Sequence, residues 1–251
     1  MEDLDTPRCV PGAADAILRT LHRHGLHWDE LTYQHDRVES YRDALEQLRS
    51  GGHTFACTCS RSQIQENGVY PGTCQRRVVP SDSPHSIRLK VPDEMIEFVD
   101  EIQGYYAQRL RTDVGDFVIS RRDRVIAYQL AVVVDDAAQR ITHVVRGADL
   151  LDNTPRQLLL FRLLGTPAPR YAHVPVLVDR SGQKLSKQTG ATAVDGGSPT
   201  DNLWLILSLL GHEPPDALRR AEPTELLAWV TAQWDLAQIP PSVTLTRFVC
   251  I

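Results

Sequence analysis

The sequence contains few lysines and no long apolar segment. Only Lys90, Lys184 and Lys187 are lysine, whereas the other 24 of the 27 basic residues are arginine. No run of 18 or more apolar residues occurs, so no segment has the composition of a transmembrane helix. The acidic start, MEDLDTPRCV, lacks the apolar stretch of a secretory signal. We therefore expect a cytoplasmic protein without a membrane partner.

The chain also lacks the excess of positive charge that marks a non-specific nucleic-acid coat. Its net charge is −5, and its basic residues form only short clusters, such as Arg121, Arg122 and Arg124. Each cluster is most simply interpreted as solvated surface charge. A local basic patch on an acidic protein would nevertheless attract RNA, because binding follows the local field.

Cysteine is scarce and odd in number, at positions 9, 57, 59, 74 and 250. An odd count in a cytoplasmic chain argues against a disulfide framework and leaves metal binding for the central three. Three thiolates can occupy three corners of a zinc tetrahedron. The spacing does not supply the fourth ligand, since no His or further Cys lies between Cys59 and Cys74. Three reduced thiols without a metal are the alternative interpretation.

Apolar periodicity predicts an α/β chain that is interrupted by a turn-rich insert. Helices are expected at 11–26, 39–52, 127–137, 154–165, 200–211 and 224–234. Strands are expected at 53–58, 86–91, 115–120, 141–147 and 171–179. This order divides the chain into a first half of the core (1–56), an insertion (57–112), a second half of the core (113–192) and a short helical end (193–251).

Two of the three lysines lie within GQKLSKQ, which spans residues 182–188. Two mobile ammonium groups around a hydroxyl can clamp a polyphosphate and neutralise charge as pyrophosphate leaves. Two surface lysines after a turn are the alternative. The use of arginine almost everywhere else favours the functional interpretation.

The KLSKQ segment resembles the KMSKS loop of class I aminoacyl-tRNA synthetases. VVVDDAAQRITHVVRGADLLDNTPRQLLLFRLLG and YAHVPVLVDRSGQKLSK resemble the glutamate-specific branch, and the resemblance covers most of residues 1–190. EDLDTPR, the three central cysteines, Gln188 and the short C-terminal end resemble the glutamyl-queuosine tRNA(Asp) synthetase family in particular. The resemblance implies an α/β fold: an incomplete Rossmann-like catalytic domain with a zinc-bearing insertion and a small helical end.

The resemblance also implies roles for individual residues. Lys187 would contact ATP, with Lys184 as its catalytic partner. Glu2, Tyr128 and Arg146 would bind free glutamate, and this set suits the ammonium and carboxylate groups of that substrate. A core tyrosine at 128 and a structural ion pair at 146 are the alternatives.

For the metal, the resemblance implies a structural zinc ion. Tyr70 would be its fourth ligand, beside Cys57, Cys59 and Cys74. Zinc in this position would hold the insertion that faces the tRNA.

The implied reaction has two steps and a monomeric enzyme. ATP, with Mg²⁺ as its counter-ion, and L-glutamate would give glutamyl-adenylate, and the glutamyl group would pass to queuosine at the wobble position of tRNA(Asp). The catalytic part of a glutamyl-tRNA synthetase is the alternative, but only about sixty residues follow Gln188, too few for a helical anticodon-binding domain. A non-catalytic, zinc-bearing RNA-binding remnant is the third interpretation.

The start of the chain departs from the family pattern. The family places a strand and a HIGH-type loop, which hold ATP, roughly forty residues before EDLDTPR, about one strand–helix–strand unit. Here Glu2 follows Met1 directly. A start site assigned too late or a truncated fragment would explain this, and we expect the 251-residue chain, expressed alone, to activate glutamate poorly or not at all.

Overall fold

The computed structural model describes residues 1–60, 63–64, 69–80, 82–185 and 194–246. Its helices are α1 (Ala13–Arg23), α2 (Val38–Ser50), α3 (Leu110–Asp113), α4 (Tyr128–Ala138), α5 (Thr154–Leu164), α6 (Pro199–Leu209) and α7 (Pro223–Gln233). Its strands are β1 (Thr54–Cys57), β2 (Ser86–Leu89), β3 (Met95–Asp100), β4 (Gly104–Arg109), β5 (Val118–Ser120), β6 (His143–Gly147), β7 (Arg170–Val174), β8 (Val176–Val178) and β9 (Thr244–Thr246). The chain is a mixed α/β protein, as the periodicity predicts.

All six expected long helices are confirmed, and their ends have local causes. Pro155 lies in the first turn of α5, where its missing N–H leaves no donor unsatisfied. The same helix stops at Gly165, whose φ of 69° belongs to the left-handed region. The side chain of Ser198 caps α6 by accepting a hydrogen bond from the backbone N–H of Asp201.

The strands form small sheets of two kinds. β1, β2 and β5 make an antiparallel sheet in the order β1-β2-β5. β6 and β7 are parallel and are joined through α5, which makes a β–α–β unit. In this pair Arg146 lies opposite His173, a register that matters for the site described below.

Two features of the strands differ from the expectation. The single strand expected at 171–179 is divided at Pro175 into β7 and β8, and β8 pairs in parallel with β9. Proline has no backbone N–H and therefore interrupts a ladder. The antiparallel hairpin β3–β4 was not expected, although Gly104, with φ of 79°, allows the turn between its strands.

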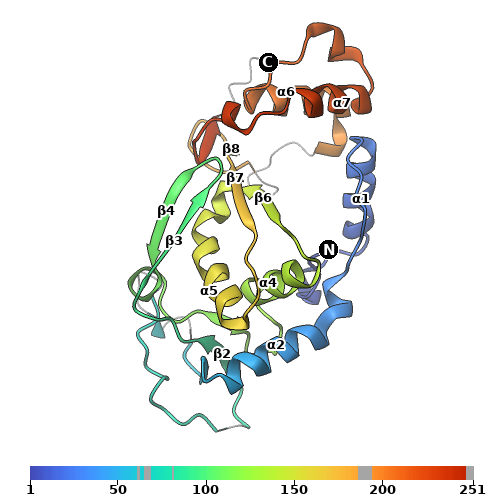
Figure 1. Cartoon of the computed structure of the whole chain (residues 1–251). Helices are drawn as coiled ribbons and strands as arrows, with labels where there is room; N and C mark the ends of the chain where they lie inside the picture. The colour runs from blue at the N-terminus through green and yellow to red at the C-terminus, as the bar shows by residue number, and fades with distance from the viewer. Residues whose placement is uncertain (61–62, 65–68, 81, 186–193, 247–251) are drawn as a thin grey trace.

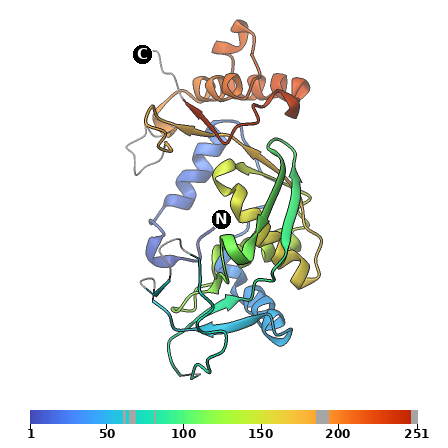
Figure 2. The ribbon, with the colours of Figure 1, turned by 90° about the vertical axis from the view of Figure 1, so that its left-hand side faces the viewer.

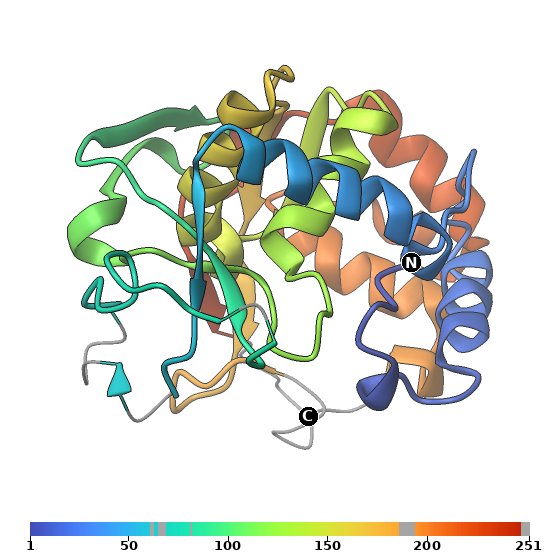
Figure 3. The same cartoon turned by 90° about the horizontal axis from the view of Figure 1, so that it is seen from below.

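The main core lies where α2, α4 and α5 meet. Figure 3 shows α2 crossing in front of α4 and α5. The fully buried residues of these three helices include Tyr41, Leu48, Leu130 and Leu160. Residues within the predicted insertion also join this core, namely Leu89, Val91, Ile96 and Leu110. The proposed limits of the insertion and of the two core halves remain predictions.

The C-terminal helices pack at one end of the molecule, opposite the three-stranded sheet (Figure 1). α6 and α7 bury Leu207, Leu226 and Val230 against each other. Figures 1 and 2 both show α1 reaching towards this pair, and the ring of His24 is 3.1 Å from the side-chain amide of Asn202. Within the described residues, no helix is long and apolar enough to cross a membrane.

Candidate functional site

Arg146, near the end of β6, is held by groups from two neighbouring elements. Its Nε donates to Nε2 of His173 on β7 at 3.0 Å. Its Nη2 donates to Oγ1 of Thr154, the first residue of α5, at 2.8 Å. Because the register of the β–α–β unit places these partners beside Arg146, the fold itself orients the guanidinium group.

His173 is in turn oriented by a buried carboxylate. Nδ1 of His173 lies 2.6 Å from Oδ2 of Asp100, and both side chains are fully buried. Burial opposes the charge on Asp100, but hydrogen bonds from His173 and from the backbone of Ile102 and Gln103 lower its pKa.

These contacts define the tautomer of the imidazole. Since arginine only donates, Nε2 of His173 must accept and Nδ1 must carry the proton towards Asp100. The line from Asp100 through His173 to Arg146 was not identified from the sequence. A histidine within the apolar YAHVPVLV segment was the one available signal.

Tyr128 and Glu2 lie on one cavity close to Arg146. The hydroxyl of Tyr128, at the start of α4, is 3.4 Å from Nη1 of Arg146. Glu2 and Tyr128 both line a cavity of about 280 Å³, whose wall also includes Gln34 and Arg121. The structure therefore brings together the three side chains expected to bind glutamate. Arg146 does not line the cavity itself and is connected to it by its contact with Tyr128.

The carboxylate of Glu2 is available to a ligand. Among the described residues it has no hydrogen-bond or ion-pair partner. Burial raises the pKa of Glu2; the charge of the amino-terminal ammonium group opposes this effect, that of Asp135 adds to it and that of Arg146 opposes it. A cationic group placed in the cavity would remove this cost.

Asp136 is a further half-buried acid near this group of side chains. Burial raises the pKa of Asp136 to about 6; Arg146 opposes the shift, and the charges of Asp135 and Glu2 add to it. Its neighbour Asp135 has a structural role instead, because it accepts hydrogen bonds from the side chains of Arg37 and two other residues, Gln34 and Tyr41.

Tyr171 on β7 presents a buried polar group to the same region. The residue is 3% exposed, and its hydroxyl lacks a hydrogen-bond partner in the part of the chain that the structure describes. The guanidinium carbon of Arg146 lies 5.2 Å from its ring centre. Burial raises the pKa of the Tyr171 phenol, so the hydroxyl stays protonated and can donate to a bound group.

The first lysine of GQKLSKQ is anchored beside the end of β6. Lys184 forms an ion pair with Asp149, and Lys184 also forms an isolated β-bridge with Val178 at the end of β8. Gly147 leaves room for the Asp149 carboxylate, because an added Cβ at position 147 would lie 2.4 Å from one of its oxygens. Lys187, the residue expected to contact ATP, lies outside the described residues.

The three central cysteines converge. The Sγ atoms of Cys57, Cys59 and Cys74 all lie within 4.8 Å of one another, and those of Cys59 and Cys74 are 3.4 Å apart without a disulfide. The hydroxyl of Tyr70 is 3.5 Å from Sγ of Cys57 and 3.8 Å from Sγ of Cys59.

These distances fit a tetrahedral zinc site. With Zn–S near 2.3 Å and Zn–O near 2.0 Å, ligand atoms lie about 3.5–3.8 Å apart. Burial opposes ionisation of Cys74, but hydrogen bonds to Tyr70 and to the backbone of Thr58 lower its pKa. Burial, together with the hydrogen bond to Cys74, raises the pKa of Cys59. The donor set thus suits a cation, which would bring all three thiols to the thiolate form.

Comparisons with known proteins found similar sequences and a similar fold. The model of a family described as tRNA synthetases class I (E and Q), catalytic domain, matches residues 1–70 and 73–214. A protein of Methylococcus capsulatus is 50% identical over 244 residues, which cover 96% of this chain and 81% of that protein. A protein of Ectopseudomonas mendocina is 50% identical over 249 residues, covering 98% and 84%. Both carry the name Glutamyl-Q tRNA(Asp) synthetase.

A solved structure shows the same fold. The glutamate tRNA ligase of Elizabethkingia meningosepticum, in complex with its amino acid, superimposes with a TM-score of 0.77 at 24% identity. The match covers 98% of this chain but 59% of that protein, so the chain spans little more than half of its length.

Proposed function

Because the chain belongs to the family of class I tRNA synthetases for glutamate and glutamine, and is thus an aminoacyl-tRNA synthetase-like ligase, we propose that it joins glutamate to queuosine in tRNA(Asp). It activates glutamate with ATP in the absence of tRNA. The glutamyl group then passes to queuosine at the wobble position. The names of the relatives that are 50% identical support this acceptor.

The observation that carries the proposal is the meeting of Arg146, Tyr128 and Glu2. Arg146 offers a carboxylate its Nη1, whose one hydrogen-bond contact within the described residues is the 3.4 Å approach to the hydroxyl of Tyr128. Glu2 offers an unpaired carboxylate to the ammonium group of an amino acid. Glutamine is disfavoured as a substrate, because its amide presents donors where the guanidinium needs an acceptor.

The proposed reaction has two steps. In the first step, the α-carboxylate of glutamate attacks the α-phosphate of ATP, pyrophosphate leaves and glutamyl-adenylate forms. In the second step, a hydroxyl of the queuosine cyclopentenediol attacks the glutamyl carbonyl, loses its proton, and AMP leaves. Both steps depend on positioning and on charge neutralisation, which Mg²⁺ accompanying ATP, Lys184 and Lys187 provide, rather than on a protein nucleophile.

Zinc has a structural role in the proposal. Cys57, Cys59, Cys74 and Tyr70 hold the ion, which ties the end of β1 to the segment that follows it. The convergence of the three thiols supports this assignment. Direct metal analysis of the purified protein tests it without any assay of activity.

The glutamate site is tested by isothermal titration calorimetry with L-glutamate and, as the control, L-glutamine. We expect saturable binding of glutamate and at least tenfold weaker binding of glutamine, since Arg146 would face an amide. Equal affinity for the two amino acids would contradict the assignment of Arg146.

The acceptor is tested with radiolabelled glutamate and the purified protein. We expect incorporation into tRNA(Asp) that carries queuosine, and none into the same tRNA without queuosine. Charging of tRNA(Glu) would instead identify a glutamyl-tRNA synthetase. Binding of tRNA without any effect of glutamate or ATP would identify a non-catalytic RNA-binding protein.

A further inference from the structure

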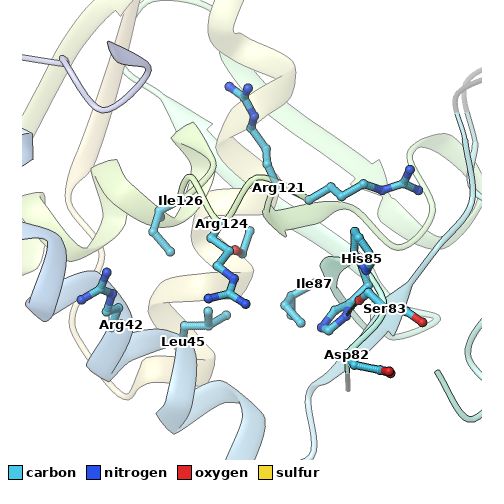
Figure 4. Close-up of a pocket in the computed structure, with 12 residues that line it drawn as sticks. Arg42, Leu45, Asp82, Ser83, His85, Ile87, Arg121, Arg124 and Ile126 are labelled. Atoms are coloured by element: carbon cyan, nitrogen blue, oxygen red, sulfur yellow. Dashed lines mark hydrogen bonds between the residues drawn. The ribbon is translucent and has the colours of Figure 1, made fainter. Parts of the chain in front are cut away.

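A second cavity, of about 440 Å³, lies beside the glutamate site. It opens between α2, the segment that leads into β2, and the loop that joins β5 to α4 (Figure 4). We refer to it as the arginine cavity. The residues of its wall used below are Arg42, Leu45, His85, Ile87, Arg124 and Ile126.

The positive charge of this cavity is only partly compensated. No hydrogen bond or ion pair joins the guanidinium group of Arg124 to the described part of the chain. Arg122, also in the wall, donates to the backbone carbonyl of Thr58 at 2.7 Å rather than to a carboxylate. Arg42 pairs with Glu39 one turn away, an exposed pair of the kind that contributes little.

The remaining charged residues of the wall face elsewhere. Arg121 is neutralised by Asp5 and Asp123, each at 2.6 Å, and Figure 4 shows it pointing away from Arg42. Asp82, the acidic residue of the wall, also points away from Arg124 and Arg42 (Figure 4). The interior of the cavity therefore keeps the positive charge of two guanidinium groups, those of Arg124 and Arg42.

The backbone at Arg124 has a conformation that glycine adopts more easily than arginine. Its φ is 67°, in the left-handed region, where a side chain costs about 1–2 kcal/mol and glycine is favoured. The turn is closed by hydrogen bonds from Arg124 N to Arg121 O and from Arg121 N to Val125 O. Arg140 has the same left-handed conformation outside the cavity, so the conformation by itself does not indicate a ligand.

The shape of the cavity favours a nucleotide over a small anion. Leu45, Ile87 and Ile126 supply an apolar surface beside the guanidinium groups, and the volume is in the range of small-molecule sites. Arg121 and Ile126 also line the cavity of Glu2 and Tyr128, so the two cavities adjoin. An RNA acceptor that reaches glutamate bound in the first cavity would therefore pass close to the arginine cavity.

We propose that the arginine cavity binds a phosphodiester and its attached nucleotide in the RNA acceptor, next to the unit that receives the glutamyl group. Arg124 and Arg42 contact the phosphate oxygens, a geometry that guanidinium groups match in pairs of hydrogen bonds. The nucleoside rests on the apolar surface. The inference rests on the proposed function, since it supposes an RNA substrate.

The test uses matched variants of the two residues. Arg124→Gly removes the guanidinium group and relieves the backbone, and Arg140→Gly is its control, because Arg140 is also left-handed (φ 54°) but does not line the cavity. Arg42→Ala is matched by Arg49→Ala, which lies on the same helix and forms the same i,i+3 pair, with Glu46. A fluorescein-labelled tRNA(Asp) transcript is the probe, and its Kd is measured by anisotropy between 50 and 200 mM salt.

We expect Arg124→Gly and Arg42→Ala each to weaken RNA binding roughly five- to tenfold and to reduce the salt slope by about one. The two control variants should bind like the unmodified protein. The melting temperature of Arg124→Gly should stay the same or rise, which separates lost binding from lost folding. Equal affinity and equal salt slope in Arg124→Gly and Arg140→Gly would overturn the proposal.

A small-molecule ligand is distinguished by a second titration, with inorganic phosphate and with AMP. If either stabilises the unmodified protein but not Arg124→Gly, while both proteins bind RNA equally, the cavity holds a free anion and the proposal is wrong. If the unmodified protein binds neither the transcript nor queuosine-containing tRNA(Asp), the proposed function fails together with this inference. If it binds RNA and Arg124→Gly does so equally well, only this inference fails.

Discussion

The proposed glutamate site and the cysteine cluster are held in place by different means. Arg146 is positioned by His173 and Thr154, and His173 by Asp100, and these three supporting side chains are almost fully buried. They come from β3, β7 and the start of α5; β3 and α5 contribute to the main core, and Ala172 of β7 packs with Ile102 and Ile239 in a smaller buried cluster.

The cysteine cluster has far less support from the fold. Cys57 ends β1, whereas Cys59, Tyr70 and Cys74 lie on connecting segments. Their apolar surroundings form a small cluster that is separate from the main core and includes Phe55 and Ile64. The comparison teaches that the first site is preorganised by tertiary packing, whereas the second depends on bonds among its own few side chains.

The largest effect is expected for Arg146→Ala. It removes the group that the fold orients towards a carboxylate, so the Kd for L-glutamate should rise at least about 100-fold. Calorimetry measures the change. Arg170→Ala is the control, because Arg170 lies on β7 but forms an exposed pair with Glu101. A Kd within about threefold of the original would show that the preorganised guanidinium is not a ligand-binding group.

Removal of the proposed zinc ion should affect the cysteine cluster and leave the proposed glutamate site intact. Cys74→Ser or treatment with a chelator should abolish bound zinc and speed proteolysis between residues 57 and 80 about tenfold or more, because the cluster has little other support. Affinity for glutamate should change less than threefold. Cys9→Ser, at an exposed free cysteine, is the matched control. Unchanged proteolysis would mean that packing alone holds the cluster.

Asp136→Asn probes the electrostatic cost of the preorganised site. The folded-state pKa of Asp136 is about 6 against an ordinary 3.8, so the folded protein binds the proton more tightly and loses stability as the pH rises from about 4 to 6. The variant has no proton to lose. It should therefore be more stable than the original chain at pH 7, by about 1–3 kcal/mol, and the gain should vanish near pH 3.5.

Urea unfolding at a series of pH values measures this difference. The low-pH end of the series is the internal control, because both proteins are then neutral at this position. A gain in stability that does not depend on pH would point to packing rather than charge. Added L-glutamate should reduce the gain if its ammonium group binds near Glu2 and Asp136.

The smallest effect is expected for Tyr171→Phe. If the unpartnered hydroxyl binds glutamate, the Kd should rise roughly three- to tenfold, as for the loss of one hydrogen bond to a charged group. Stability should not fall, because the buried hydroxyl lacks a partner in the described residues. Tyr105→Phe, at an exposed tyrosine of β4, is the control. Unchanged affinity would place the hydroxyl outside the glutamate site.

Much of the local structure could be predicted from short patterns. Thr154-Pro155 and Gly165 delimit α5, and the 3.6-residue periodicity located the other long helices. The hairpin β3–β4 was missed, because its strands lie in a turn-rich region and become strands only by pairing with each other. The site residues were found through a family pattern, and composition alone would have left Tyr128 as a core tyrosine.

The sequence by itself determined the helices, the spacing of the cysteines and the lysine motif, because these depend on residues close together in the chain. Only the tertiary structure decided that Asp100 orients His173 and that His173 orients Arg146. It also decided that Glu2 shares a cavity with Tyr128 and that Arg42 and Arg124 line another. The physical reason is that strand register and helix packing select which distant side chains meet, and no local pattern encodes that selection.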